Sequence, residues 1–328
     1  MGARKALICG ISGQDGTWLA KFLLEKGYRV FGSSRDAQVS SFANLKKLGI
    51  FDRVHLLSMV NNDFRSVLQA LTQVEPDEIY NLAGQSSVGL SFQQPVETLE
   101  SIATGTLNLL EAIRFMGRPI RFYNASSSEC FGDTGEHGLA NEDTPFRPRS
   151  PYAVAKAAAH WEVANYREAY GVYACSGIVF NHESELRSPR FVTKKIVSTV
   201  ARIASGSDEK LELGNIQIWR DWGYAPEYVE GMWGMMQCDT PDDFVLATGD
   251  SHSLKEFVVG VFAGLGLRWE EHVQIEESHF RPTDLKFSRG DPEKAWVKLR
   301  WKATTRFPQL LDKLIAAELK DADTRGAA

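Results

Sequence analysis

The 328-residue sequence has few cysteines and no long hydrophobic run. Its four cysteines, Cys9, Cys130, Cys175 and Cys238, include no CxxC pair and no regular spacing, which excludes a disulfide framework. No stretch approaches the roughly 20 apolar residues of a transmembrane helix. The apolar run before Gly10 is too short for a signal peptide. We therefore expect a cytoplasmic protein in a reducing compartment, without a membrane partner.

An excess of basic residues is also missing. Thirty-seven lysines and arginines stand against 42 aspartates and glutamates, and the formal net charge is −5. Proteins that bind nucleic acids in general are usually basic, so we expect no nucleic-acid partner. A local basic pocket for a small anionic ligand stays compatible with this balance. Because 43% of the residues are hydrophobic, the chain can bury a sizeable core in one large or two ordinary domains.

Short apolar runs alternate with helical patterns through the first 180 residues. The predicted strands cover residues 4–10, 28–32, 54–59, 78–84, 120–127 and 173–181. A helix is predicted between Gly16 and Gly27, and further helices cover residues 64–73, 99–115 and 151–170. Strands that alternate with helices form βαβ units and a mainly parallel sheet. We therefore predict an α/β fold with a Rossmann-type, doubly wound sheet.

Beyond residue 180 the alternation is less regular. We predict a polar loop over 182–191, helices over 192–205, 225–237 and 253–264, and strands over 211–215 and 242–249. The chain is therefore divided into a dinucleotide-binding domain over 1–180 and a smaller α/β C-terminal lobe over 181–328. We expect this lobe to bind the substrate and some of its segments to return to the first domain.

Three glycines, Gly10, Gly13 and Gly16, have the spacing GxxGxxG between a predicted strand and a predicted helix. Glycine there permits a tight turn and a close approach of the backbone to a pyrophosphate, and the helix N-terminus attracts the phosphates. The alternative is a glycine-rich turn without a ligand. At the end of the next strand, Arg35 favours the 2′-phosphate of NADP, whereas Asp36 would suit the ribose of NAD, unless both are solvated loop charges.

A tyrosine and a lysine, Tyr152 and Lys156, lie four residues apart and therefore on one face of a predicted helix. A nearby ammonium lowers the pKa of a phenol, which could then take a hydroxyl proton while hydride leaves the same carbon. Ser127 and Glu129 follow at the end of an earlier strand, where open α/β sheets keep their sites. The alternatives are an ordinary amphipathic helix and a surface acid.

Several longer motifs are more specific than these patterns. They include GISGQDG at 10–16, NHES at 181–184, FVTKKI at 191–196 and RDWG at 220–223. With them the chain resembles the extended short-chain dehydrogenase/reductases, and among these the GDP-mannose 4,6-dehydratases, from about residue 5 to residue 315. The resemblance implies a bound NADP, with NAD as an alternative, and a GDP-sugar substrate. It also implies a homodimer or homotetramer.

The resemblance assigns roles to the candidate catalytic residues. Tyr152 matches the general base and Lys156 its partner, Ser127 stands at the hydroxyl residue that binds the 4-hydroxyl, and Glu129 matches the base that removes the C5 proton. In this reaction hydride leaves C4, water leaves across C5 and C6, and hydride returns to C6. The product is a 4-keto-6-deoxy sugar that is still attached to GDP.

The resemblance also places the ligand-binding residues. The cofactor would contact Gly10, Ser12, Gly13, Gln14, Asp15, Gly16, Arg35, Asp63, Leu82, Ala83, Gln85, Ser86, Tyr152, Lys156, His182 and Arg187. The GDP-sugar would contact Ser87, Ser127, Asn181, Lys195, Leu213, Gly214, Asn215, Arg220, Arg281 and Asp284. No metal site is expected, because the sequence His-Glu at 182–183 is not followed by a second histidine at helical spacing.

Four positions depart from the family pattern. Arg35-Asp36 stands where the family has two arginines, and Val60 stands where it has an aspartate near the adenine. Ser87 replaces a histidine, and Ser127 replaces a threonine. The loss of a methyl group at Ser127 would suit a larger sugar, such as a GDP-manno-heptose. Two further alternatives stay open: a GDP-sugar epimerase or reductase on the same scaffold, and a non-catalytic nucleotide-sugar-binding protein.

Overall fold

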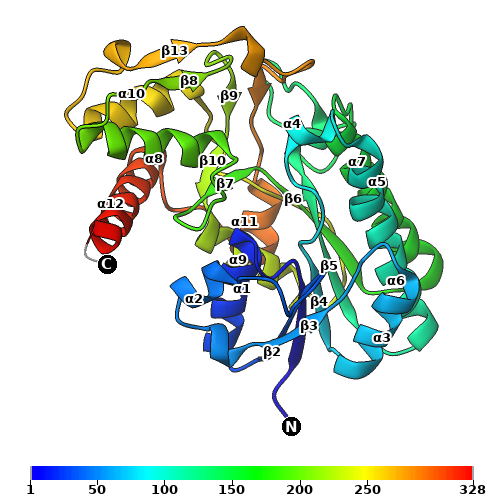
Figure 1. Cartoon of the computed structure of the whole chain (residues 1–328). Coiled ribbons are helices and arrows are strands. Elements are labelled where there is room, and N and C mark those ends of the chain that lie inside the picture. Colours follow the sequence, from blue (N-terminus) through cyan, green and yellow to red (C-terminus); the bar gives the residue numbers. More distant parts are fainter. Residues whose placement is uncertain (1, 327–328) are drawn as a thin grey trace.

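The computed structural model describes residues 2–326 and contains a seven-stranded parallel sheet (Figure 1). The strand order is β11-β6-β5-β4-β1-β2-β3, and every neighbouring pair is parallel. These strands are β1 (Lys5–Cys9), β2 (Arg29–Ser34), β3 (His55–Ser58), β4 (Glu78–Asn81), β5 (Arg121–Ser127), β6 (Ala174–Val179) and β11 (Phe244–Leu246). The doubly wound order confirms the predicted fold class.

Helices cover both faces of this sheet, because its strands are apolar on both sides. In β1, Ala6 and Ile8 pack with α1 (Gln14–Glu25) and α9 (Ala225–Met235), whereas Leu7 and Cys9 face the opposite layer. That opposite layer is formed by α3 (Phe64–Val74), α6 (Gly105–Met116) and α7 (Pro151–Tyr170). Shorter helices between the strands are α2 (Ala43–Lys47), α4 (Val88–Ser91) and α5 (Pro95–Leu99).

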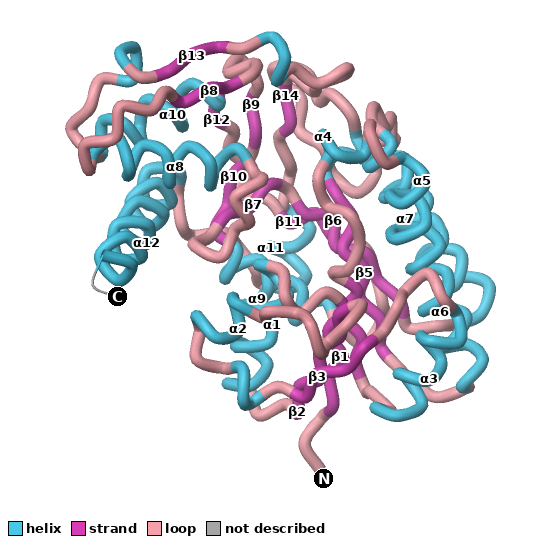
Figure 2. The backbone as a smooth tube through the Cα atoms, viewed as in Figure 1, coloured by secondary structure: helices cyan, strands magenta, loops and turns pink. Residues whose placement is uncertain are grey.

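A second apolar core lies beside the carboxyl ends of the strands, in the upper part of Figure 1. It is built by α8 (Val192–Ala204), α10 (Leu254–Gly264) and α12 (Phe307–Gly326). Three small sheets join these helices, as Figure 2 shows: β7 (Asn181–Glu183) with β10 (Trp222–Tyr224), β8 (Leu211–Leu213) with β13 (Val273–Ile275), and β9 (Trp219–Arg220) with β12 (His252–Ser253) and β14 (Phe287–Ser288).

Segments from beyond residue 180 also pack on the main sheet. β11 pairs with β6, α9 packs on α1, and α11 (Glu293–Leu299) lies against β11 and α9. The division of the chain at residue 180 stays a prediction. Among the described residues, no helix is long and apolar enough to cross a membrane.

The structure differs from the sequence prediction mainly in its short elements. The start of the predicted loop, residues 182–183, belongs to strand β7, and the short strands β9, β10, β12, β13 and β14 were not predicted. Helices α11 and α12 were not predicted either. The helix expected over 99–115 begins as α6 at Gly105, because residues 100–104 form a π-helical turn after α5.

Candidate active site

The glycine turn joins β1 to α1 at the carboxyl edge of the sheet. Gly10 has a φ of +82°, which an L-residue rarely adopts. A Cβ on Gly10 would lie 3.0 Å from backbone atoms of Ala83, and one on Gly16 would lie 2.5 Å from the Gly10 carbonyl oxygen. The turn lies where the strand order reverses between β1 and β4, which is the ligand crevice of open α/β sheets. The turn therefore fits a dinucleotide.

Lys156 lies on α7 and points toward the end of β5. Its Nζ donates a hydrogen bond to the Ala125 carbonyl at 2.7 Å and lies 5.9 Å from the centre of the Tyr152 ring. The side chain is almost fully buried, and this burial lowers the pKa of Lys156 to about 8. The helix begins at Pro151, with the Ser150 hydroxyl accepting the Ala153 N–H, so that Tyr152 and Lys156 occupy its first two turns.

Tyr152 does not titrate as the sequence pattern predicted. Burial raises the pKa of the phenol, and the Ser127 hydroxyl and the more distant Arg187 oppose this only in part. The expected lowering of this pKa is wrong for the protein chain, because desolvation is the largest influence and Cys130 and Glu129 raise the pKa further. Tyr152 therefore holds its proton at neutral pH in the protein alone.

Glu129 lies beside Tyr152, in the turn that follows β5 (Ser128–Phe131). Its backbone N–H donates to Ser127 Oγ at 3.3 Å, and this bond fixes the start of the turn. Burial raises the pKa of the carboxyl group, while the positive charges of Arg220 and Arg281 oppose the shift. A carboxyl group with a raised pKa is suited to exchanging a proton near neutral pH.

Two arginines predicted to bind substrate lie near this carboxylate. Arg220 is 4% exposed, and it donates to Leu285 O at 2.8 Å and to Asp284 Oδ1 at 3.0 Å. Arg281 pairs with the same Asp284 carboxylate at 3.5 Å. Although 91 residues separate Glu129 from Arg220 in the sequence, the fold brings Glu129, Arg220, Arg281 and Asp284 together. The two guanidinium groups of this cluster could bind an anionic ligand, although the two carboxylates balance their charge in the protein alone.

A buried ion pair connects the glycine turn to β7. His182 Nε2 lies 2.9 Å from Asp15 Oδ2, and Nδ1 lies 2.6 Å from the Phe180 carbonyl oxygen. Because both ring nitrogens face acceptors, the imidazole carries two protons. Burial disfavours both charges, but the attraction between them outweighs the effect of burial. The attraction lowers the pKa of Asp15 to about 2 and raises the pKa of His182. Gln14 strengthens this connection by donating to the His182 carbonyl at 3.1 Å.

Several predicted cofactor residues have local partners instead. The Asp63 carboxylate caps α3 by accepting the N–H groups of Arg65 and Ser66. Gln85 donates to the carbonyl of Ser87, whose hydroxyl caps α4. The carboxyl end of β2 is followed by Arg35, and that of β4 by Leu82, Ala83 and Ser86. The Ser12 carbonyl accepts a hydrogen bond from the Asn44 side-chain amide.

The remaining predicted substrate residues lie in the C-terminal part of the chain. Asn181 begins β7, and Lys195 on α8 donates to the Glu212 carbonyl at 2.6 Å. Leu213 ends β8, Gly214 packs against the carbonyl of His279, and Asn215 accepts the Gln217 N–H at 2.9 Å. No hydrogen bond or ion pair of the described residues joins this set to Ser127, Glu129, Tyr152 or Lys156.

Sequence reasoning assigned no role to two buried acids of the motifs. Glu183 is the third residue of NHES and is 2% exposed, and Asp221 is the second residue of RDWG and is fully buried. Asp221 accepts hydrogen bonds from Thr248, Gly249 and Gly290, so it ties three distant segments together. Glu183 stands among the polar residues of NHES and Asp221 follows Arg220, so no pattern in the sequence pointed to the burial of these two acids.

The doubly wound sheet, the glycine turn and the Tyr–Lys pair on the helix after β5 define an enzyme scaffold of the short-chain dehydrogenase/reductase type. The family model described as "GDP-mannose 4,6 dehydratase" matches residues 7–314. The protein "GDP-mannose 4,6 dehydratase 1" of Arabidopsis thaliana is 46% identical over 327 residues, which cover 96% of this chain and 90% of the relative. The chain therefore belongs to the GDP-mannose 4,6-dehydratase family.

A second relative and a solved structure also match the chain. The "GDP-mannose 4,6-dehydratase" of Vibrio cholerae serotype O1 is 40% identical over 360 residues, covering 99% of this chain and 96% of that protein. Among solved structures, the UDP-glucose 4-epimerase of Thermus thermophilus in complex with NAD matches with a TM-score of 0.84 and 25% identity. This match covers 99% of this chain and 100% of the epimerase chain.

Proposed function

We propose that the chain is a nicotinamide-dependent hydro-lyase that converts GDP-mannose to GDP-4-keto-6-deoxy-mannose. Membership of the family supports this, and the observation that carries it is the position of Glu129. This carboxylate lies two residues after Ser127, in the turn that follows β5, and is within reach of the charges of Arg220 and Arg281. A reductase or an epimerase that inverts C4 needs no base beside the ketone, whereas elimination of water does.

The cofactor of the proposed reaction is NADP. The glycine turn between β1 and α1 and the Asp15–His182 pair would hold it, with Arg35 beside the adenosine ribose. Asp36 suits NAD less well, because its carboxylate accepts the Gln38 N–H at 2.9 Å within its own turn. When bound, this cofactor would supply hydride transfer, from C4 of the sugar and back to C6, so that there is no net oxidation.

The protein side chains supply binding and proton transfer. Tyr152 Oη receives the proton of the sugar 4-hydroxyl, and the Ser127 hydroxyl orients that group. Burial raises the pKa of Tyr152, so a positive charge must offset this rise during the reaction. The ammonium group of Lys156, 5.9 Å from the centre of the Tyr152 ring, would supply that charge. Glu129 removes the proton at C5, which becomes acidic beside the C4 ketone, and passes it to the hydroxide that leaves C6, so that one water is lost.

The test is the conversion of GDP-mannose by the purified protein. With NADP present, the alkaline absorbance of a 4-ketosugar should rise, and mass spectrometry should show the loss of one water. GDP-manno-heptose runs beside it, since Ser127 would favour a larger sugar. Glu129→Gln should abolish product formation, while the exposed Glu136→Gln leaves it unchanged. Normal turnover by Glu129→Gln would refute the role of Glu129 as the base. The absence of product from both sugars would refute the proposed dehydratase activity.

We also propose a homodimer, or a tetramer built from two such dimers. Helices α5, α6 and α7 lie together on one side of the molecule (Figure 1) and expose the large apolar side chains of Val96, Phe115, Val154 and Trp161. Such a face is suited to a second copy of the chain. Sedimentation should give twice the chain mass, and Trp161→Glu should shift the protein toward the monomer. The cytoplasm is the proposed compartment, because all four cysteines are free thiols.

A further inference from the structure

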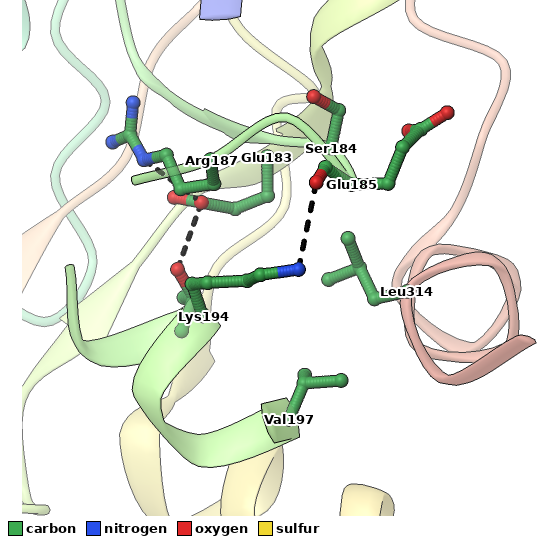
Figure 3. Close-up of a pocket in the computed structure, with 8 residues that line it drawn as sticks. Glu183, Ser184, Glu185, Arg187, Lys194, Val197 and Leu314 are labelled. Atoms are coloured by element: carbon green, nitrogen blue, oxygen red, sulfur yellow. Dashed lines mark hydrogen bonds and ion pairs between the residues drawn. The ribbon is translucent and has the colours of Figure 1, made fainter. Parts of the chain in front are cut away.

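A buried carboxylate lies behind one of the predicted cofactor residues. Glu183, at the end of β7, is 2% exposed and faces α8 (Figure 3). The Thr193 hydroxyl donates to its Oε2 at 2.8 Å, and the Arg187 Nε lies 3.0 Å from the same oxygen as an ion pair. The Nε–H is not aligned for a hydrogen bond, so charge attraction is the main part of this contact. Glu183 therefore has two partners and no access to bulk water.

Arg187 is held on two sides. The guanidinium lies over the Phe191 ring, 3.8 Å from the ring centre, and Nε faces Glu183. In Figure 3 the two terminal nitrogens point away from Glu183 and from the small cavity that it lines. The positive charge of Arg187 acts on two residues of the candidate active site. It lowers the pKa of Asp15, and it opposes the rise in the pKa of Tyr152.

This arrangement leaves the outer edge of the guanidinium available to a phosphate. Arginine binds a phosphate best with two nitrogens of its planar fork. An arginine that used those nitrogens for a protein carboxylate would have to break that contact first. Here the carboxylate lies at the Nε side and supplies a fixed counter-charge, so the partly buried guanidinium is already oriented before a ligand arrives.

We propose that Glu183 is a positioning residue that holds Arg187 in the orientation needed to bind a phosphate of the dinucleotide. It also links this contact to α8 through Thr193, and α8 carries Lys195, two residues further on. The proposal rests on the proposed function, because the phosphate belongs to the cofactor. Glu183 itself touches neither cofactor nor substrate; it acts through Arg187.

The test is a double-mutant cycle on the dissociation constant of NADPH, measured by its fluorescence on the full-length protein freed of nucleotide. Glu183→Gln keeps the shape and the Thr193 contact but removes the charge, and it should weaken binding about tenfold. Arg187→Gln should weaken binding at least as much. The double variant should bind like Arg187→Gln alone, because Glu183 has no effect once Arg187 is gone. A purely structural role would instead give effects that multiply.

A matched control is Glu185→Gln, which removes one negative charge from the same cavity, where the Glu185 side chain points away from Arg187 (Figure 3). It should leave the NADPH affinity unchanged. If Glu183→Gln does not fold, as judged by its melting temperature, Thr193→Val replaces it. That variant removes one donor to the carboxylate and should weaken binding about threefold, again only when Arg187 is present.

The outcomes separate this proposal from the proposed function. If the unaltered protein binds NADPH and dehydrates GDP-mannose while Glu183→Gln binds with unchanged or higher affinity, the positioning role is refuted. Effects of Glu183→Gln and Arg187→Gln that multiply would refute it as well. If the unaltered protein neither binds NADPH nor turns over a GDP-sugar, the proposed function fails, and the positioning role fails with it.

Discussion

Replacing Gly16 by alanine should destabilise the protein, because the added methyl group has no space. Gly16 is buried in the first turn of α1, and its Cβ would lie 2.5 Å from Gly10 O and 2.7 Å from Ile11 Cα. Ordinary contacts are 3.4–4 Å, and both neighbours are backbone atoms, so the turn must retreat by roughly 1 Å in a packed interior. Overpacking of this kind costs about 1–3 kcal/mol.

The melting temperature measures this effect, and we expect a fall of about 2–6 °C for Gly16→Ala. Gly13→Ala is the matched control. Gly13 is the exposed N-cap of α1 with a φ of −72°, and its Cβ would meet only Gly10 O, at 3.4 Å. Its melting temperature should therefore stay within about 2 °C of the unaltered protein, while the methyl group weakens NADPH binding. The steric reasoning fails if Gly16→Ala melts like the unaltered protein, or if Gly13→Ala loses more stability.

Three further predictions address the chemistry and the ion pair. Tyr152→Phe should lower kcat by about 10²–10⁴-fold with little change in NADPH affinity, and a kcat within tenfold of normal would contradict the role of the phenol. Asp15→Asn should lower the melting temperature most between pH 3.8 and 6.5. Below this range the stability contributed by Asp15 is lost as the pH falls toward 2, and above it the stability contributed by His182 is lost as the pH rises through its raised pKa. A difference in melting temperature that is independent of pH would contradict the pairing. Ser127→Thr should lower kcat/KM for GDP-manno-heptose more than for GDP-mannose, and equal losses for the two sugars would argue against a size effect.

The sequence predicted the local parts of the candidate site well. The helix expected over 151–170 is α7, and the strand expected over 120–127 is β5, which ends at Ser127. These segments are long enough to show a clear hydrophobic period, and capping at Ser150 marks the helix start. The glycine turn could also be predicted from local sequence, because a single tight connection between a strand and a helix fixes the spacing of its glycines.

Most of the short strands (β9, β10, β12, β13 and β14) could not be predicted, since two or three residues carry no periodicity. Strand β9, which carries Arg220, exists only through pairing with β12 and β14, which lie more than 30 residues further along the chain. The pKa of Tyr152 was predicted with the wrong sign for a related reason. Spacing along a helix reveals a neighbouring charge, but the depth of burial is known only when the surrounding elements have packed.

The sequence by itself therefore determined the alternation of strands and helices, the glycine turn and the Tyr152–Lys156 spacing. All of these depend on contacts within a few residues. Only the tertiary structure decided which distant residues meet: Asp15 with His182, and Glu129 with Arg220. The physical reason is that these charges are brought together by strand pairing and helix packing, and burial then sets their strength and their protonation.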